Sequence, residues 1–527
     1  MTPDWLSGVI AVVLAALLMA ADQLSAPSVP ADAPKSSRYM RLRARLAGAF
    51  ASAFTALTVF ALLYAIFGRL FTASAVGVLL IGLLWAGNRL KEKLLAEPLV
   101  FSDIFLAGHA LRYPRLYFGY APRWIWPAIA GGLVCIGLLA STEPAANSAQ
   151  RWRCAALFFV PWVLLVAGIL WSSGMRRFVL SAGPLSFNAN RDAALFSPMG
   201  AALMHCAWHA GHREELRSRF RRLNGQVVDR PVQSSSAKRV STAAKAAAAH
   251  AVPKHIILVQ AESFCRLDLL LNRPCATPAI ARLMREGRSG PLQLDWRGAY
   301  TMRSEFAVLT GFAPRVLETY GFDPYRLAAM EPMSSLVWTL RARGYRTEAW
   351  HPNDGRFFDR CRVMPNLGFE HFFDLDALDA LHQMQDGEPL PRFGRYVDDA
   401  GLLRAAAKRL EQEEQPTFLF IVTMEAHGPW HADAFPGAEA LSETERYEAH
   451  LSRLDQGVLA IAEAIRSGRL DAGLVLYGDH LPGLDALASH ACQADTAWFS
   501  WRPDLTHEEK RLRPEILCKE VLRHASP

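Results

Sequence analysis

Long apolar runs crowd the first 175 residues of this chain, and they constrain its fold more than any other feature. Because lipid offers the backbone no hydrogen-bond partners, a segment that crosses a membrane must be a helix of about 20 mostly apolar residues. Nearly uncharged stretches close to this length are Leu6–Ala21, Leu46–Phe67, Thr72–Gly87, Ile125–Ala140 and Ala155–Trp171. The sequence therefore predicts an N-terminal transmembrane module over residues 1–175 with about five helices.

The first of these stretches has two interpretations. Leu6–Ala21 stands where a signal peptide would stand, but the four residues that open the chain, Met-Thr-Pro-Asp, carry no positive charge. Signal peptides begin with a basic segment. We therefore expect Leu6–Ala21 to be a retained helix.

A composition change separates the apolar part from the rest of the chain. Ser and Ala dominate residues 231–251, where large apolar side chains are nearly absent, so this stretch cannot bury a core. The sequence predicts a partly helical or flexible linker over residues 176–252, followed by a water-soluble domain over residues 253–527. The eight cysteines show no metal-binding spacing. Cys265 and Cys275 are either a disulfide of an oxidising compartment or free thiols.

The net charge of +7 and the mean hydropathy of +0.09 exclude two classes of protein. A chain this apolar is not intrinsically disordered. The basic residues are mostly Arg and form no stripe with interleaved aromatic residues, which argues against nucleic-acid binding.

After residue 253 the pattern changes to short apolar runs between helical segments. Strands are expected at residues 255–260, 345–350, 417–423 and 473–477. Continuous apolar strands between helices are typical of a parallel sheet with both faces covered. The sequence predicts an α/β domain of this kind, in which ligands bind beyond the carboxyl ends of the strands.

Each expected strand is followed by residues whose side chains can bind a metal ion or take part in catalysis. The residues that follow the four strands are, in chain order, Glu262, then His351, Asn353 and Asp354, then Glu425 and His427, then Asp479 and His480. Carboxyl ends of parallel strands meet at one edge of a sheet, so these side chains are expected on a common rim.

Glu262, Asp479 and His480 form a set of hard oxygen donors with one imidazole. Such a set suits Mn²⁺, Mg²⁺ or Zn²⁺, and the oxygen majority without a thiolate favours Mn²⁺. Three protein ligands leave a coordination position open for chemistry. We therefore predict a single divalent metal at Glu262, Asp479 and His480.

Thr301 is the candidate for the remaining position. It precedes a plausible helix, Met302–Thr310, and a hydroxyl at a helix N-terminus faces free N–H groups that welcome a phosphate. Metal coordination is one way to activate a weak oxygen nucleophile. Thr301 has a second interpretation as the N-cap of that helix, and the two roles are compatible.

These residues resemble the motifs of the alkaline phosphatase/sulfatase superfamily, and within it the lipoteichoic acid synthase branch of membrane phosphoglycerol and phosphoethanolamine transferases. The segment Val-Gln-Ala-Glu-Ser with Glu262 resembles the first metal ligand of that branch, Thr301 with Glu305-Phe306 its T-x-x-x-E-F nucleophile motif, and Asp479-His480 its metal pair. The resemblance spans nearly the whole chain. It implies five N-terminal helices, a linker and an extracytoplasmic catalytic domain.

The resemblance also implies substrate contacts in the segment that follows the second strand. The implied phosphate and head-group contacts are His351, Asn353, Phe358, Arg360 and His427. Two positions depart from the branch: Phe358 stands where it has Trp, and Asn353 where it has an acidic residue. These departures leave the identity of the head group and the acceptor open.

Taken together, these features predict a two-step transfer. Thr301 attacks a phospholipid, expected to be phosphatidylglycerol, and a glycan or polymer hydroxyl then takes the phosphoglycerol group with His427 as acid or base. The alternatives are a phosphoethanolamine transferase and a phosphodiesterase or phosphatase of the same superfamily. Sulfate-ester hydrolysis is not expected, because no Cys or Ser is followed by x-Pro-x-Arg.

The charge distribution and the expected chemistry favour opposite topologies. The loops at residues 22–45 and 88–124 hold most basic residues of the apolar part, and with five spans they share a side with the C-terminal half. The positive-inside rule therefore places that half in the cytoplasm. Phospholipid donors and surface glycans, however, occur together outside the cytoplasm. For this reason we predict a multi-pass protein of the bacterial inner (cell) membrane with an extracytoplasmic, periplasmic catalytic domain.

Overall fold

The computed structural model describes residues 10, 13–18, 20–22, 38–103, 112, 122–228, 252–296, 298, 300–490 and 495–526. The chain divides into two compact units, residues 1–217 and 218–527, and each is described by itself. Of the predicted linker, residues 176–228 are mostly helical, whereas 229–251 lie outside the described residues.

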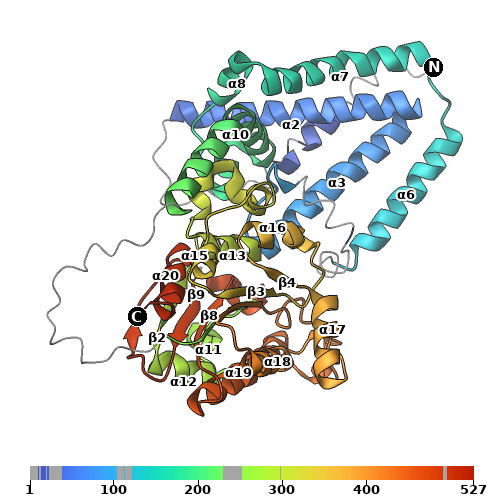
Figure 1. The fold of residues 1–527 in the computed structure, drawn as a ribbon. Helices are drawn as coiled ribbons and strands as arrows, with labels where there is room; N and C mark the ends of the chain where they lie inside the picture. Colours follow the sequence, from blue (N-terminus) through green and yellow to red (C-terminus); the bar gives the residue numbers. More distant parts are fainter. Residues whose placement is uncertain are drawn as a thin grey trace. The chain divides into compact units, whose positions relative to one another are not determined.

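The N-terminal unit is helical (Figure 1). Four helices are long and apolar enough to cross a membrane, α2 (Arg38–Phe67), α3 (Leu70–Leu95), α6 (Ile125–Thr142) and α7 (Ser148–Trp171), and a shorter apolar helix covers Val13–Asp22. The unit thus contains four or five apolar helices. Three further helices follow: α8 (Ser173–Leu180), α9 (Ala189–Phe196) and α10 (Pro198–Val228).

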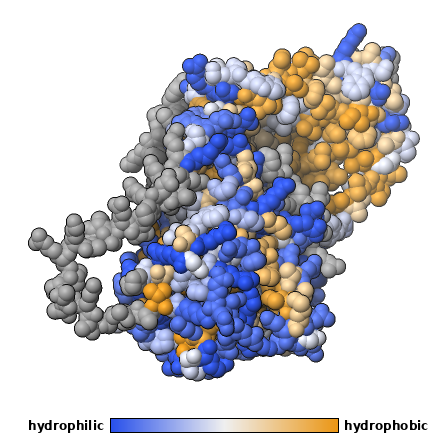
Figure 2. Space-filling view, in the orientation of Figure 1, coloured by the Kyte–Doolittle hydropathy of each residue, from blue (hydrophilic) through white to orange (hydrophobic). Residues whose placement is uncertain are grey.

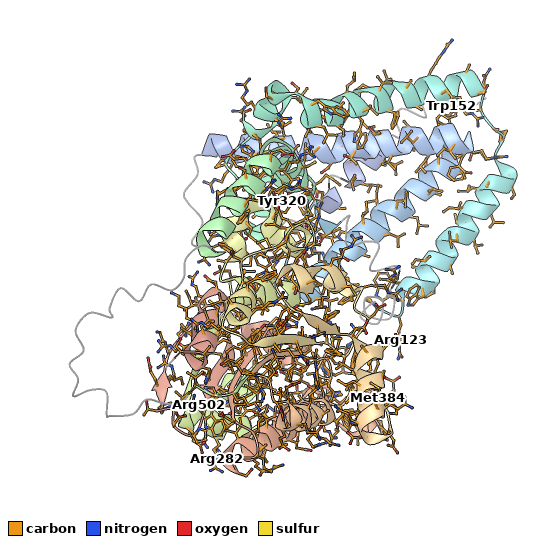
Figure 3. All side chains as sticks on the ribbon, in the orientation of Figure 1. Arg123, Trp152, Arg282, Tyr320, Met384 and Arg502 are labelled. Atoms are coloured by element: carbon orange, nitrogen blue, oxygen red, sulfur yellow. The ribbon has the colours of Figure 1, made fainter. Side chains whose placement is uncertain are left out.

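The apolar surface of these helices fits a lipid environment. None of the described side chains of α6 is buried, although the helix is almost entirely apolar. Figure 2 shows hydrophobic residues gathered over the region where Figure 1 places α3 and α6. Trp152, labelled in Figure 3 near the start of α7, is 56% exposed. Tryptophan at a helix end is typical of the membrane–water interface.

The C-terminal unit contains the predicted α/β domain with a largely parallel sheet. Its eight strands lie in the order β10-β2-β9-β8-β1-β7-β3-β4. Their bounds are β1 (His255–Ala261), β2 (Arg288–Gln293), β3 (Arg346–Trp350), β4 (His371–Phe373), β7 (Thr417–Val422), β8 (Ala472–Gly478), β9 (Asp495–Trp501) and β10 (Glu508–Glu509). β8, β1, β7, β3 and β4 run parallel, and β9 is antiparallel to both its neighbours. A separate two-stranded hairpin joins β5 (Arg392–Phe393) to β6 (Tyr396–Val397).

Helices cover both faces of the sheet (Figure 1). The principal helices are α11 (Leu267–Leu271), α12 (Pro278–Glu286), α13 (Thr301–Thr310), α14 (Tyr325–Ala328), α15 (Leu336–Ala342), α16 (Arg360–Asn366), α17 (Leu375–Asp386), α18 (Asp399–Gln412), α19 (Glu443–Arg466) and α20 (Pro514–His524). Ile257 and Val259 of β1 pack into a core shared with α12, α18 and α19, while the alternate residues Ile256 and Leu258 are equally buried. Burial on both faces explains the continuous apolar strands.

Candidate active site

The three predicted metal ligands meet at the carboxyl ends of two neighbouring strands. Glu262 directly follows β1, Asp479 and His480 directly follow β8, and Ala261 pairs with Gly478 in the parallel register. One ligand atom from each of the three lies within 4.8 Å of the others, and all three side chains are buried. The sheet register therefore creates this cluster without help from distant loops.

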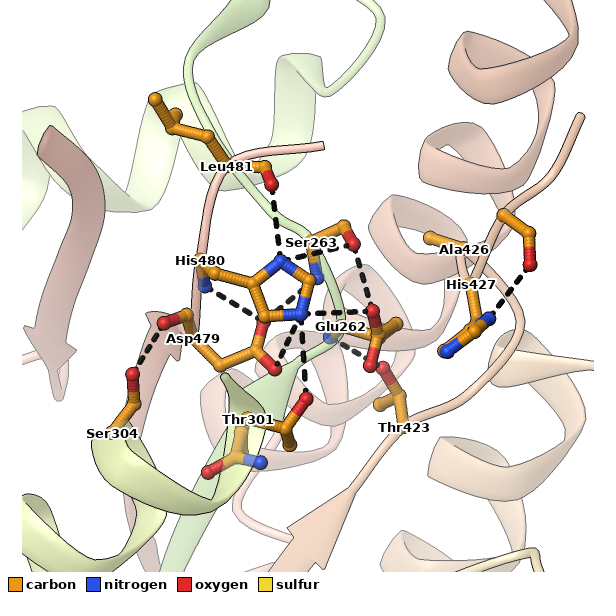
Figure 4. Close-up of polar contacts among 12 residues, drawn as sticks. Glu262, Ser263, Thr301, Ser304, Thr423, Ala426, His427, Asp479, His480 and Leu481 are labelled. Atoms are coloured by element: carbon orange, nitrogen blue, oxygen red, sulfur yellow. Dashed lines mark hydrogen bonds and ion pairs between the residues drawn. The ribbon is translucent and has the colours of Figure 1, made fainter. Parts of the chain in front are cut away.

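His480 Nε2 lies at the centre of the cluster (Figure 4). It is 3.3 Å from Glu262 Oε1 and 3.3 Å from Asp479 Oδ2. On the other side of the ring, Nδ1 lies 3.1 Å from the carbonyl oxygen of Leu481, which can only accept a hydrogen bond. Nδ1 therefore carries a proton, and Nε2 is the nitrogen left for a metal ion.

Thr301 brings a hydroxyl to the same point. It is the first residue of α13, and its Oγ1 is 3.3 Å from His480 Nε2. Tyr300, not Thr301, is the N-cap of the helix, so the capping role is not what places this hydroxyl. The Ser304 hydroxyl, on the same helical turn, donates to the Asp479 carbonyl oxygen and ties α13 to the end of β8.

Ser263 supports the cluster, a role that the sequence did not indicate. Its backbone N–H donates to Asp479 Oδ1 at 2.8 Å, and its hydroxyl donates to Glu262 Oε1 at 2.7 Å. To do both, Ser263 adopts a left-handed conformation with φ of 55°, which is uncommon for a residue other than glycine. It stands in the quoted Val-Gln-Ala-Glu-Ser segment, but nothing in a sequence marks a serine as left-handed.

The three ligands shift one another's protonation. Burial alone would raise the pKa of Glu262, but the imidazole of His480 outweighs it and lowers that pKa to about 2. Burial raises the pKa of Asp479 to about 7, and the charge of Glu262 adds to the rise. Burial opposes the charged form of His480, yet the carboxylates of Asp479 and Glu262 raise its pKa to about 9.

The cluster fits a divalent cation. Asp479 Oδ2 is buried and has no hydrogen-bond partner among the described residues, a costly arrangement for a carboxylate oxygen. Two carboxylates face a single imidazole, so the cluster lacks positive charge. A cation held by Glu262, Asp479 and His480 would supply the missing partner and the missing charge.

Two other residues expected on the rim, His427 and Glu425, differ in where their side chains point. His427 donates from Nδ1 to the Gly428 carbonyl oxygen at 2.7 Å, and Figure 4 shows its other nitrogen turned toward Glu262. The ring of Tyr396, from the β5–β6 hairpin, lies 5.9 Å from that of His427 and was not anticipated. Glu425 lies apart: it is fully buried, bonded to the backbone N–H of Asp399 and 3.0 Å from His450.

The implied substrate contacts lie between β3 and α16. His351 and Arg360 are buried, and Arg360 Nη1 lies 3.2 Å from His351 Nε2. The Nδ2 donor of Asn353 is buried without a hydrogen-bond partner among the described residues. Phe358 has a left-handed backbone and lies 5.4 Å from the Arg360 guanidinium. The roles of these residues toward a substrate stay predictions.

Comparison with known proteins identifies the domain around this site. Residues 254–513 match the family model described as Sulfatase. The capsular polysaccharide biosynthesis protein RkpI of Rhizobium meliloti is 28% identical over 496 residues, which cover 89% of this chain and 85% of RkpI. A putative cyclic beta-1,2-glucan modification protein of the same organism is 29% identical over 252 residues, 44% of this chain and 36% of that protein.

Among solved structures, the lipoteichoic acid synthase LtaP of Listeria monocytogenes is similar to the chain. The TM-score is 0.42 at 20% sequence identity, over 52% of this chain and 72% of that chain.

Proposed function

Because residues 254–513 form a domain of the sulfatase family, we propose that the chain is a membrane-anchored, metal-dependent transferase of phosphoryl groups. It moves phosphoglycerol from phosphatidylglycerol to a cell-surface or periplasmic glycan through a phospho-threonine intermediate. The observation that carries this proposal is the Thr301 hydroxyl, 3.3 Å from the His480 nitrogen at the centre of a buried three-ligand cluster.

Glu262, Asp479, His480 and Thr301 would hold one divalent cation, which we propose to be Mn²⁺. When bound, such a cation lowers the pKa of a coordinated hydroxyl and offsets negative charge on a phosphoryl group. Thr301 is the only one of the four that is partly exposed, so its hydroxyl is the one that a substrate can reach.

The chain's own residues then carry two displacements at phosphorus. In the first, Thr301 Oγ1 forms a bond to phosphorus as the bond to the diacylglycerol oxygen breaks, and diacylglycerol leaves with a proton. In the second, a glycan hydroxyl forms a bond to phosphorus as the Thr301 ester breaks. The product is a phosphoglycerol diester of the glycan, and Thr301 is regenerated.

His427 is suited to move the protons in these steps. Its Nδ1 proton is committed to the Gly428 carbonyl oxygen at 2.7 Å, so the neutral ring has its lone pair on Nε2. A base of this kind accepts a proton from the attacking glycan hydroxyl and returns it to a leaving oxygen. His351 and Arg360 are proposed to contact the phosphoryl oxygens.

Asn353 favours glycerol over ethanolamine as the head group. Its buried Nδ2 donor has no partner in the part of the chain that the structure describes, and a hydroxyl oxygen satisfies such a donor whereas an ammonium group does not. No sulfatase-type aldehyde precursor occurs at the position of Thr301, so transfer or hydrolysis of a phosphodiester suits the site better than sulfate chemistry.

The acceptor is proposed to be a glycan on the strength of the two Rhizobium meliloti relatives. Their names connect them with a capsular polysaccharide and with a cyclic glucan, and the first aligns along 89% of this chain. Both glycans provide hydroxyl groups that can attack the threonine ester.

Mass spectrometry of Thr301 tests the proposal. The full-length protein in detergent micelles with Mn²⁺ is incubated with a mixture of phosphatidylglycerol and phosphatidylethanolamine, and the Thr301 peptide is weighed. A phosphoglycerol adduct is expected, and it is absent from Thr301→Ala. A phosphoethanolamine adduct would identify the other transferase, and release of the head group to water without an adduct would identify a phosphodiesterase.

The catalytic unit is proposed to lie outside the cytoplasm. Two basic residues that the positive-inside rule counts have acidic partners inside the N-terminal unit: Lys91 is buried and 2.6 Å from Asp103, and Arg89 is 3.2 Å from Glu92. An alkaline phosphatase fusion after residue 260 should therefore be active, and a cytoplasmic reporter at the same point silent. The opposite pattern would rule out transfer to a surface glycan.

A further inference from the structure

A second buried cluster lies directly behind the nucleophile, and Glu305 is its centre. Glu305 stands one helical turn after Thr301 on α13 and is fully buried. Its carboxylate accepts hydrogen bonds from Arg360 Nε at 3.3 Å and Arg360 Nη2 at 2.9 Å, from Gln260 Nε2 at 3.2 Å, and from the Tyr325 hydroxyl. The side chains of Arg360, Gln260 and Tyr325 therefore all donate hydrogen bonds to the Glu305 carboxylate.

Two partners of Glu305, Gln260 and Arg360, come from elements that build the active site. Gln260 belongs to β1, two residues before Glu262. Its amide orientation is fixed because the Tyr477 hydroxyl donates to its oxygen. Arg360 begins α16, at the end of the segment that starts at His351. Glu305 therefore links the helix of the nucleophile to a strand that precedes a metal ligand and to the segment proposed to bind substrate.

Arg360, which is paired with Glu305, also contacts His351 and determines which of its ring nitrogens carries the proton. An arginine side chain has only donors, so the 3.2 Å contact between Arg360 Nη1 and His351 Nε2 requires a lone pair on that nitrogen. The proton of a neutral His351 is then on Nδ1. Burial and the positive charge of Arg360 both hold the pKa of His351 well below its usual range, which keeps the ring neutral.

The segment between His351 and Arg360 needs to be held in place. Phe358 and Asp359 both have a φ of 56°, and consecutive left-handed residues other than glycine are unfavourable unless the surroundings enforce them. Arg360 follows them directly, and its guanidinium packs over the Phe358 ring. The ion pair with Glu305 anchors the end of this strained segment.

We propose that Glu305 is a positioning residue, which holds Arg360 and through it fixes the tautomer of His351 and the path of the segment His351–Arg360 beside Thr301. The effect on catalysis rests on the function proposed above, whereas the tautomer of His351 does not. A purely structural role for the ion pair predicts a loss of stability and nothing more.

Glu305→Gln tests the proposal, with Glu348→Gln as its matched control. Glu348 is likewise a buried glutamate of this domain, 2.8 Å from Arg409 and 2.7 Å from Arg346. Its described side-chain partners are these two arginines and Trp350, none of which is a residue of the site. Glu305→Gln should slow formation of the Thr301 adduct about 10- to 100-fold at saturating lipid, with Mn²⁺ affinity unchanged. Glu348→Gln should lower the melting temperature at least as much and leave the adduct rate within about twofold. Equal adduct rates in the two variants would overturn the proposal.

A double variant tests whether Glu305 acts through Arg360 or affects the adduct rate independently of it. If Glu305 acts through Arg360, the double variant Glu305→Gln/Arg360→Gln should be no slower than Arg360→Gln alone. Multiplied losses would overturn the proposal. Should Glu305→Gln fail to fold, Tyr325→Phe removes one donor to Glu305. It should slow the adduct step more than Tyr345→Phe, which removes a buried hydroxyl bonded to the Pro253 carbonyl oxygen; the reverse order would overturn the proposal.

Nuclear magnetic resonance of isotope-labelled imidazole nitrogens gives a readout that needs no turnover. The full-length protein is loaded with diamagnetic Mg²⁺, and the His351 signals are identified by their loss in His351→Gln. The expected result is a proton on Nδ1 in the unsubstituted protein and population of the other tautomer in Glu305→Gln. An unchanged tautomer would refute the proposal even if activity fell. If the unsubstituted protein forms no adduct, the proposed function fails and the tautomer comparison still decides this inference.

Discussion

The two buried charged clusters of the C-terminal unit use their carboxylates in opposite ways. Glu305 accepts hydrogen bonds on both oxygens and is paired with Arg360 at 2.9 Å. Asp479 leaves Oδ2 without a hydrogen-bond partner among the described residues, and it shares one imidazole with Glu262. A satisfied cluster holds its surroundings in one arrangement. A cluster short of donors and positive charge is incomplete without a cation, so we propose that the first is a scaffold and the second a binding site.

Removing the nucleophile should give the largest loss without disturbing either cluster. Thr301→Ala should lower transfer to less than a few per cent of the unsubstituted level, because the hydroxyl forms the intermediate. Mn²⁺ binding and thermal stability should change little, since three ligands remain. Thr310→Ala, at the other end of α13, is the control and should retain activity. Substantial turnover in Thr301→Ala would place the nucleophile elsewhere.

Removing a ligand should empty the incomplete cluster. Glu262→Ala, Asp479→Ala and His480→Ala are each expected to lose bound Mn²⁺ and activity together, because ligands of one ion act as a unit. Metal analysis of the purified proteins and adduct formation are the measurements. A variant with full metal occupancy would show that its residue is not a ligand.

The sheet and the metal cluster were the parts most open to prediction from sequence. Parallel strands buried on both faces have a continuous apolar pattern, and the register of β1 with β8 brings the residues after them together. Glu262, Asp479 and His480 could therefore be expected side by side from position along the chain alone. The same rule placed Glu425 on the rim, where the structure instead turns it to His450. A strand end fixes where a residue lies but not where its side chain points.

The supporting residues could not be found in this way. Ser263 acts through a left-handed backbone, and Glu305 through contacts with Gln260, Tyr325 and Arg360, which are distant in the chain. Neither conformation nor long-range contact leaves a local pattern. The N-terminal helices show the reverse case, since apolar length alone predicts them and four of the five expected spans coincide with long helices.

Ser263→Ala should weaken the metal site without emptying it. The substitution removes the hydrogen bond to Glu262 Oε1 but keeps the backbone N–H that bonds Asp479 Oδ1. Loss of such a supporting bond typically costs 10- to 100-fold in metal affinity. Titration with Mn²⁺ measures the change. Ser289→Ala removes a buried serine bonded to the Met284 carbonyl oxygen and serves as control, with unchanged affinity expected; equal effects would assign Ser263 to folding only.

The sharpest test of the contrast between the two clusters is the pH dependence of metal binding. In the metal-free protein the pKa of His480 is about 9 and that of Asp479 about 7, so both groups hold protons that a cation must displace. Lowering the pH from 9 to 7 protonates His480, and Mn²⁺ affinity should fall about tenfold per pH unit. Below pH 7 Asp479 is protonated as well, and the fall should steepen to about a hundredfold per unit. Calorimetry in two buffers with different heats of ionisation should detect roughly one to two protons released per Mn²⁺ bound at pH 7. Glu305→Gln should leave this slope unchanged, because its carboxylate belongs to the satisfied cluster and exchanges no proton with the metal. An affinity that stays flat from pH 9 to pH 6 would mean that Asp479 and His480 do not bind the ion.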